Sequence, residues 1–179
     1  MSSPELLIRR ARVSDVSAIR AIVQPLAEAR ILVAKETVAY YEGIQEFRIA
    51  EVDGEVAGFG ALHVMWEDLA EVRTLATSRH LKGTGVGSAI LKQLLLDAAE
   101  IGVGRLFCLT FETDFFNRHG FVELEGTPIE PDVYAELLRS PDDGVAEFLD
   151  LARVKPNTLG NCRMIKYLDN DAVGHPQIT

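Results

Sequence analysis

The stretch RHLKGTGVGSAILKQLLLDA, residues 79–98, places glycines at three alternate positions directly before an apolar helix. Glycine loses more conformational freedom on folding than any other residue, so a loop this rich in glycine needs bare backbone for a reason. Gly83, Gly85 and Gly87 allow successive backbone amides to point into one concavity. A helix that begins at Val86 adds N–H groups and the positive end of its dipole. The stretch therefore predicts a cradle for a phosphate-bearing ligand.

Two known phosphate loops and one plain turn compete for this stretch. The nucleoside-triphosphatase loop requires a lysine and Ser/Thr after its last glycine, whereas Lys82 precedes the glycines here. A dinucleotide fold agrees with the order strand, glycines, helix and strand, and with Glu112 downstream. That fold requires its first glycine almost directly after the strand, however, and here residues 78–82 lie between the strand and the first glycine. A purely structural turn remains the third alternative.

Length and charge limit which classes of protein are compatible with the sequence. The chain has 179 residues, a formal net charge of −9 and 47% hydrophobic residues, which is ordinary for one globular domain. The acidic balance disfavours nucleic acid as a partner, because a duplex binder needs a basic surface. A small polyanion could still bind near the glycine loop, because basic residues are concentrated just before it in the sequence. They are Arg73, Arg79, His80 and Lys82.

No segment is apolar over the roughly 18 residues that a membrane span needs, and the first residues lack the pattern of a signal peptide. Cys108 and Cys162 are expected to be reduced packing residues, so we predict a cytoplasmic protein that contacts no membrane. The histidines share no metal-ligand spacing, so no metal is predicted; they are His63, His80, His119 and His175.

Hydrophobic periodicity and turn residues predict one α+β domain over residues 1–168 and a disordered tail over residues 169–179. The expected strands cover residues 6–12, 47–52, 55–66, 70–77, 105–112, 121–124 and 162–168. The expected helices cover residues 15–30, 37–45, 86–101, 113–120 and 133–138. An Asp53–Gly54 pair predicts a hairpin between the second and third strands.

The order of these motifs resembles the GCN5-related N-acetyltransferase family. TLATSRHLKGTGVGSAIL looks like the family's acetyl-CoA loop, Gln/Arg-x-x-Gly-x-Gly/Ala, with Lys82, Gly85 and Gly87 in the three places. FFNRHGF, residues 115–121, resembles its second motif, Phe-Tyr-x-x-x-Gly-Phe, and IRRARVSDVSAI resembles its usual opening. The resemblance implies the family's fold, a mixed central β-sheet flanked by helices.

Within the family, ILVAKE, AEVRTLAT and LFCLTFETDFFNRHGF look like the acetyltransferase domain of N-acetylglutamate synthases, which act in arginine biosynthesis. The whole chain, GVAEFLDLARVKPNTLGNCRM included, resembles the short actinobacterial form that lacks an amino-acid kinase domain. This resemblance implies acetyl-CoA as cosubstrate and the α-amine of L-glutamate or L-glutamine as acceptor. Transfer would be direct, in a ternary complex, and a homodimer is common among relatives.

The resemblance also assigns the cofactor contacts. Backbone groups of Leu75, Ala76 and Thr77 would pair with the pantetheine arm. The Leu75 amide would donate to the thioester oxygen as charge develops there. Arg118 would reach a phosphate, with a solvated helix charge as the alternative. The loop residues expected to hold the pyrophosphate are Lys82, Gly83, Thr84, Gly85, Val86, Gly87 and Ser88.

Catalysis needs a base, because an amino acid arrives as an ammonium ion that cannot attack. Glu71 lies four residues before Leu75, where many family members carry the catalytic glutamate, and Glu112 is the second candidate. Either could instead be an ordinary ion-paired carboxylate.

The family's usual acid, a tyrosine, falls on Phe116, which donates nothing. The thiolate would then leave unassisted, or take a proton from water or from a hydroxyl such as that of Thr110 or Thr113.

Carboxylate groups of the acceptor call for cationic side chains. Arg73 shares a strand face with Glu71 if the strand is regular. The four candidates for binding the acceptor are Lys35, Arg73, Lys155 and Arg163, each with a plain surface charge as the alternative.

Two other functions stay open on the sequence alone. One is acetylation of another small amine or of a protein N-terminus. The other is an acyl-CoA sensor without turnover, an alternative that the absence of the family's tyrosine leaves open.

Overall fold

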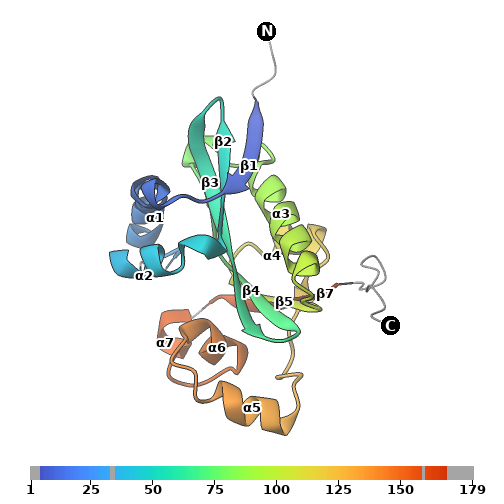
Figure 1. Ribbon diagram of the computed structural model, residues 1–179. Helices are drawn as coiled ribbons and strands as arrows, with labels where there is room; N and C mark the ends of the chain where they lie inside the picture. The colour runs from blue at the N-terminus through green and yellow to red at the C-terminus, as the bar shows by residue number, and fades with distance from the viewer. Residues whose placement is uncertain (1–4, 33–34, 159, 169–179) are drawn as a thin grey trace, which may run out of the picture. The chain divides into compact units, whose positions relative to one another are not determined.

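The computed structural model describes residues 5–32, 35–158 and 160–168 (Figure 1). The predicted tail over residues 169–179, and His175 with it, lie outside these residues. Hydrogen bonds join the strands into a seven-stranded mixed sheet in the order β1-β2-β3-β4-β5-β7-β6. The chain divides into two compact units. The first contains the residues up to His63 and Val72–Ile101, and the second contains Val64–Glu71 and the residues from Gly102 on.

Antiparallel strands form the frame of the first unit. β1 (Leu6–Arg10) pairs with β2 (Phe47–Val52), and β2 pairs with β3 (Glu55–Trp66). The turn between β2 and β3 has φ of +51° at Asp53 and +84° at Gly54. Positive φ at both central residues is what a tight hairpin needs to match the strand twist, so the Asp-Gly pair is explained. β4 (Leu69–Thr77) enters this unit at Val72.

Helices cover both faces of these strands (Figure 1). On one side lie α1 (Val16–Glu28) and α2 (Thr37–Glu42), and on the other lies α3 (Val86–Glu100). Short 3-10 turns precede or follow them, η1 (Val13–Asp15), η2 (Ile44–Glu46) and η3 (Arg79–Leu81). The core beneath α1 and α2 consists of Val16, Ile19, Val23, Tyr40, Phe47, Ile49, Phe59, Ala61 and Ala76.

Two glycines of β3 let α3 approach the sheet closely. A Cβ added at Gly58 would lie 2.7 Å from the carbonyl oxygen of Ala76, and one added at Gly60 would lie 3.0 Å from side-chain carbons of Ile90 and Leu75. The bare backbone therefore makes room for the apolar face of α3. Buried side chains of that face are Val86, Ile90, Leu91, Leu94 and Ala98.

The second unit is built around a parallel pair. The start of β4 pairs with β5 (Arg105–Thr110), Leu69 opposite Arg105 and Glu71 opposite Phe107. β5 pairs antiparallel with β7 (Cys162–Tyr167), which pairs in turn with β6 (Val122–Glu123). The helices of this unit are α4 (Thr113–Arg118), α5 (Pro131–Leu137), α6 (Asp143–Phe148) and α7 (Lys155–Thr158).

One face of β4, β5 and β7 is covered by α5 and α6. The core there contains Met65, Leu69, Phe107, Leu124, Leu137, Val145, Phe148, Leu149 and Ile165. The rings of Phe107 and Phe148 meet edge to face with centroids 5.5 Å apart. Aromatic pairs in this arrangement are favourable beyond the apolar area they bury.

The predicted α+β class, with a mixed sheet flanked by helices, is confirmed. Two short helices, α6 and α7, were not predicted, and the strand expected over residues 105–112 ends at Thr110. Both cysteines are free thiols, Cys108 buried and Cys162 half-buried. The domain boundaries predicted at residues 1–168 stay a prediction.

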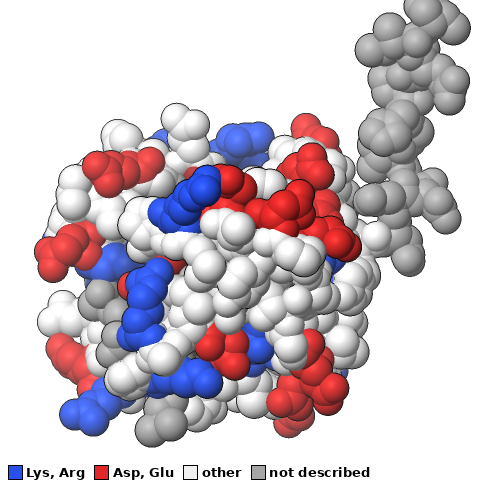
Figure 2. Space-filling view, turned by 90° about the horizontal axis from the view of Figure 1, so that it is seen from below, with Lys and Arg blue, Asp and Glu red and all other residues white. Residues whose placement is uncertain are grey.

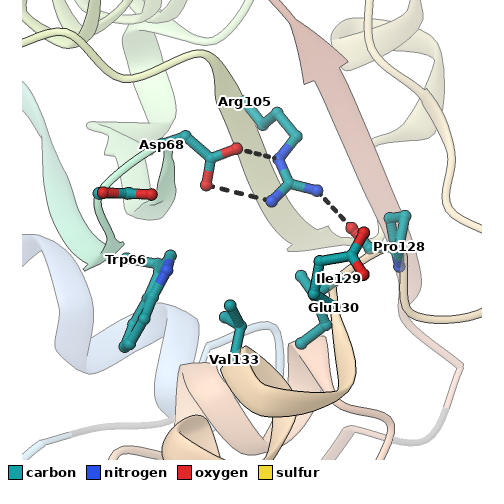
Figure 3. A pocket seen from close by; sticks show the side chains of 8 residues that line it. Trp66, Asp68, Arg105, Pro128, Ile129, Glu130 and Val133 are labelled. Atoms are coloured by element: carbon teal, nitrogen blue, oxygen red, sulfur yellow. Dashed lines mark hydrogen bonds and ion pairs between the residues drawn. The ribbon is translucent and has the colours of Figure 1, made fainter.

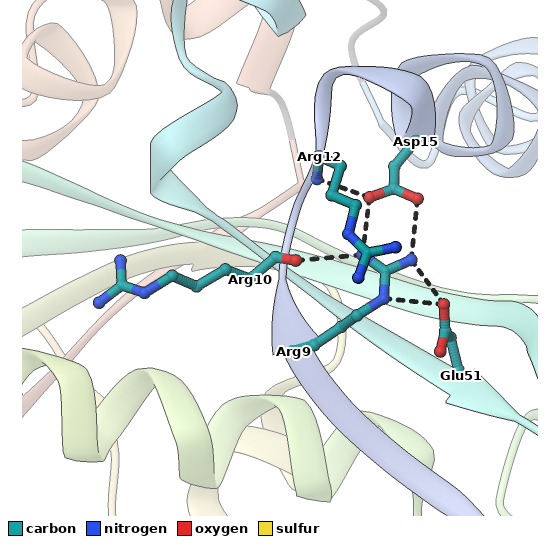
Figure 4. A network of polar contacts seen from close by, with 5 residues as sticks. All are labelled: Arg9, Arg10, Arg12, Asp15 and Glu51. Atoms are coloured by element: carbon teal, nitrogen blue, oxygen red, sulfur yellow. Dashed lines mark hydrogen bonds and ion pairs between the residues drawn. The ribbon is translucent and has the colours of Figure 1, made fainter.

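A buried ion pair fixes the start of α1 against the sheet (Figure 4). Arg9 on β1 donates from both terminal nitrogens to Asp15, at 2.8 and 2.9 Å, and also to Glu51 on β2. Asp15, the last residue of η1, also accepts from the backbone amide of Arg12, the N-terminal cap of that turn, at 2.6 Å, as in a capping box. The hydrogen bonds from Arg9 hold the pKa of Asp15 below its ordinary value.

We expect Asp15→Asn to lower the free energy of unfolding by about 2 kcal/mol at pH 7, because it leaves Arg9 partly unpaired. Since the folded-state pKa of Asp15 is depressed, its contribution is complete above the unfolded value of about 4 and is lost as the pH falls through the folded value. The difference between wild type and variant should therefore narrow below about pH 4. Urea unfolding at several pH values measures this difference in the free energy of unfolding. Glu125→Gln, which replaces an exposed carboxylate, is the control. A difference that persists unchanged into strong acid would contradict this.

Candidate functional site

The glycine loop needs glycine at two of its three positions. Gly83 has φ of +83° and Gly85 of +93°, the left-handed region that other residues avoid. A Cβ at either would meet nothing within 4 Å, so backbone conformation and not crowding requires glycine there. Gly87 lies inside α3 with ordinary helical geometry. The expected need for bare backbone is thus confined to Gly83 and Gly85.

The loop is held from within by one carbonyl. Leu81 accepts from the amide of Thr84 at 3.2 Å and from its hydroxyl at 2.7 Å. Gly85 is the N-terminal cap of α3 and accepts from the amide of Ala89 at 3.0 Å. The first amides of α3, from Val86 onward, point away from the helix's own carbonyls. Together with the helix dipole they make a site suited to phosphate, and Lys82 stands exposed at its entrance.

An irregularity interrupts β4 just before the predicted cofactor strand. Thr74 has φ of +54°, which costs a non-glycine residue on the order of 1–2 kcal/mol. This conformation turns the peptide between Thr74 and Leu75 out of the regular ladder direction. The amide of Leu75, the predicted oxyanion donor, is therefore presented differently from those of its neighbours. Ala76 is buried, and Leu75 and Thr77 are half-buried.

Glu71 is a buried carboxylate, with only 6% of the residue exposed. It stands opposite Phe107 in the parallel pair, so its side chain shares a face with Leu69 and Phe107, the face that α6 covers. The pKa of the Cys108 thiol is raised by burial and, less strongly, by the charge of Glu71. The thiol is therefore protonated and inert, as expected of a packing residue.

Glu112, the second candidate base, lies in a different setting. It is exposed at the N-terminus of α4, and its amide donates to the hydroxyl of Thr110 at 2.9 Å. Arg118 is exposed in the last turn of the same helix. Phe116, where the family's tyrosine is expected, is buried against Phe115 and Phe121. It is a core residue, and it donates no proton.

A cavity of about 210 Å³ opens on the face of the second unit that carries Glu71. It is lined by Leu109, Glu147, Asp150, Val154, Lys155, Gly160, Asn161 and Arg163. Leu109 and Arg163 stand opposite each other in the register of β5 and β7. Because side chains alternate along a strand, both share the face of Phe107 and hence of Glu71. Glu71 and Arg163, far apart in sequence, thus belong to one face of the strands, and Lys155 of α7 lines the cavity together with Arg163.

Arg163 is anchored by backbone carbonyls. Its Nε donates to Glu147 at 3.0 Å, and one terminal nitrogen, Nη2, donates to the carbonyls of Gly126, at 2.9 Å, and Phe148. Burial lowers the pKa of this guanidinium and the nearby Asp150 carboxylate opposes that effect. Lys155 is exposed, with its amine 3.5 Å from Asp150.

The other predicted acceptor residues belong to the first unit. Arg73 is half-buried on β4, and Lys35 is exposed just before α2. Sequence reasoning missed Leu109, Asp150 and Asn161 as lining residues. Their only signal was proximity to Lys155 and Arg163 in sequence or in strand register.

A larger cavity, about 360 Å³, lies at the opposite ends of β4 and β5 (Figure 3). Asp68 pairs there with Arg105, whose Nε lies 2.9 Å from the carboxylate, and Arg105 also donates to the carbonyl of Pro128. Trp66 and Val133 form its walls. Ligands of α/β proteins bind at the carboxyl ends of parallel strands, whereas this cavity lies where β4 and β5 begin. It is not the candidate site.

Surface charge is mixed on the face shown in Figure 2, where lysines and arginines alternate with acidic groups. The described residues of that face form no continuous basic surface of the kind that nucleic acid needs. Over residues 5–32, 35–158 and 160–168, no three His, Cys, Asp or Glu side chains are grouped to hold a metal ion. No helix in that part of the chain has the length and apolar character to cross a membrane.

Comparison with known proteins agrees with this geometry. The Acetyltransferase (GNAT) family matches residues 22–121. An amino-acid acetyltransferase of Mycobacterium tuberculosis is 52% identical over 165 residues, 90% of this chain and 94% of that protein.

Two solved structures are similar over nearly the whole chain. A M. tuberculosis protein in complex with CoA and NLQ superposes with a TM-score of 0.87 at 52% identity, covering 91% of this chain and 99% of that one. An N-acetylglutamate synthase from Neisseria gonorrhoeae, complexed with coenzyme A and N-acetyl-glutamate, has a TM-score of 0.74 at 25% identity. The match covers 94% of this chain but 36% of the synthase.

The glycine loop yields a matched pair of variants. Gly85→Ala and Gly102→Ala both place alanine at a positive φ, +93° and +85°, at opposite ends of α3 and with nothing within 4 Å. Each should lower the free energy of unfolding by about 1–2 kcal/mol. Only Gly85→Ala should weaken binding of CoA, the ligand of the structural neighbours, by about tenfold or more, because it displaces the helix amides. Calorimetric titration with CoA measures the affinities, and equal losses in both variants would show that the loop contributes only stability.

Proposed function

The chain belongs to the acetyltransferase (GNAT) family and is an acetyl-CoA-dependent N-acetyltransferase, and we propose that it acetylates the α-amine of a free amino acid, L-glutamate or L-glutamine. This would be the first step of arginine biosynthesis, carried out in the cytoplasm. The observation that carries the proposal is the 52% identity to an amino-acid acetyltransferase across nearly the full length of both chains. A homodimer, common among relatives, belongs to the proposal as well.

Glu71 is proposed as the base. The ammonium group of the acceptor must lose a proton before its nitrogen attacks the thioester carbon. A carboxylate that is 6% exposed, on a strand face that continues to a cavity with cationic groups, is suited to that task. Proton transfer would occur directly or through one water. Glu112, exposed at the start of α4, remains the second candidate.

Backbone groups of β4 are proposed to orient the thioester. The turned peptide before Leu75 would aim its amide at the thioester oxygen, where negative charge develops during attack. Leu75, Ala76 and Thr77 would continue as a strand edge that pairs with the pantetheine arm. In this arrangement the cost of the left-handed Thr74 is offset by a donor fixed in advance of the reaction.

The pyrophosphate is proposed to bind the loop from Lys82 to Ser88, at the N-terminus of α3. Lys82 would add a charge, and Arg118 would reach a further phosphate. The leaving thiolate has no tyrosine to protonate it, because Phe116 is a core residue. Water, or the hydroxyl of Thr110 or Thr113, would supply the proton.

Acceptor carboxylates are proposed to contact Arg163 and Lys155, which line the cavity of the second unit. Arg73 and Lys35 stay predictions from the sequence. Arg163 has its Nε and Nη2 committed to carbonyls, which fixes the guanidinium plane rigidly. A rigid cation binds a carboxylate with less loss of side-chain entropy than a mobile one.

Thiol release from acetyl-CoA with a panel of free amino acids tests the proposal. Turnover is expected with glutamate or glutamine. Glu71→Gln should lower kcat by about a hundredfold or more, because general-base catalysis contributes about 10²–10⁴, with KM for acetyl-CoA little changed. Glu112→Gln, its matched control, should change kcat by no more than a few-fold.

Other results would redirect the assignment. Full activity in Glu71→Gln with loss in Glu112→Gln would move the base to Glu112. Bound CoA without turnover of any amino acid would contradict the proposed acceptor class. Turnover would then be sought with other amines and with peptide N-termini.

A further inference from the structure

An exposed aromatic side chain stands at the carboxyl end of β5. Phe111 follows the last residue of that strand, and 48% of the residue is exposed to solvent. Single exposed apolar residues are common on proteins, so the exposure alone carries no functional meaning. The place in the fold does, because ligands of α/β proteins bind at the carboxyl ends of parallel strands. Phe111 therefore lies at the end of the sheet where a ligand is expected.

The ring of Phe111 rests against bare backbone. A Cβ added at Gly160 would lie 3.3 Å from Cε1 of the ring, which is tighter than ordinary van der Waals contact. Gly160 also has φ of +88°, a conformation that residues with a side chain rarely adopt. Both observations explain glycine at this position. We call the contact of Phe111 with Gly160, which joins the end of β5 to the loop before β7, the rim contact.

The rim contact adjoins the polar cavity of the second unit. Gly160 lines that cavity, and so does Leu109, two residues before Phe111. Phe107 and Leu109 share one face of β5, and a side chain two residues further on continues the same row. Phe111 itself lies outside the lining of the cavity. Its ring therefore stands at the mouth of the cavity, between β5 and the loop before β7.

An amino-acid acceptor has polar ends and an aliphatic stem between them. Apolar surface for that stem is offered within the cavity by Leu109 and Val154, and at its mouth by the exposed ring of Phe111. Contact between the stem and the ring removes apolar surface of both from water, which favours binding. This contribution is independent of the chemical group that ends the acceptor side chain.

We propose that Phe111 binds the acceptor: its ring, held against Gly160, covers the aliphatic stem of the amino acid and retains it in the cavity. A phenyl ring has no proton to donate, so the residue takes no part in proton transfer. The stem does not react, and its contact with the ring is the same in substrate and transition state. The ring therefore acts on KM and not on kcat. This inference rests on the proposed function.

Steady-state kinetics of Phe111→Ala with L-glutamine and with L-glutamate test this inference. For both acceptors kcat/KM should fall by the same factor, about five- to tenfold, through a higher KM. The KM for acetyl-CoA should change less than twofold. Phe111→Leu, which restores apolar bulk, should recover most of the loss. Leu138→Ala is the matched control and should change nothing, because Leu138 is also 48% exposed but follows α5, outside the lining of the cavity.

A second variant probes the rim contact itself. Gly160→Ala places a Cβ against the ring, and it also strains the left-handed backbone. That strain is the same with and without the ring, so the effect of Gly160→Ala is measured in the wild type and in Phe111→Ala. The loss of kcat/KM for the acceptor should be at least threefold larger in the wild type. Equal losses would show that Gly160 does not hold the ring.

Two results would overturn the inference and leave the proposed function intact. One is a KM for the acceptor that Phe111→Ala leaves unchanged. The other is a rise in the KM for acetyl-CoA alone, which would assign the ring to the cofactor. Absence of turnover of any amino acid by the wild type would instead overturn the inference together with the proposed function. Urea unfolding of each variant, run in parallel, separates a loss of folded protein from a loss of binding.

Discussion

The parallel pairing of β4 with β5 along Leu69–Glu71 is the contact on which the chemistry of the second unit depends. It places Glu71 opposite Phe107, on a face otherwise filled by apolar side chains of β5, α5 and α6. A carboxylate there is shielded from water, yet it stands one row along the strands from Leu109 and Arg163. The same register therefore builds the core and places the proposed base on the strand face that also carries the polar cavity.

The first unit supplies the cofactor loop by a different constraint. Gly58 and Gly60 let α3 lie close against β3, and the helix begins at Val86 directly after two glycines with left-handed backbone, Gly83 and Gly85. Sheet packing thus fixes the end of the helix where amides and dipole combine. The left-handed Thr74 adds a second, local strain on β4. Strained backbone that is maintained beside a site points to function.

Much of this could be predicted from the sequence because the signals are local. The apolar runs FRIAEV and EVAGFGALHVMW and the intervening Asp-Gly predict both strands and the turn to the residue. The glycine loop and its helix have an equally local signature. Phe116 in place of a tyrosine predicts that the usual acid is missing, and its burial agrees.

What could not be predicted depends on long-range packing. The short helices α6 and α7 lack a periodic pattern of their own, and α6 forms because Val145 and Phe148 bury against Phe107. The cavity combines Leu109 with residues that lie 38 to 54 positions further along the chain, from Glu147 to Arg163, so Leu109 carries no sequence signal for it. The carbonyl anchoring of Arg163 depends on where the chain at Gly126 and Phe148 passes, which no local pattern encodes.

A crystal structure of the enzyme with CoA and L-glutamine bound would test the central claim most directly. The account predicts the α-nitrogen of glutamine within hydrogen-bond reach of Glu71, or one water away. Glutamine bound with its amine remote from Glu71 would contradict it.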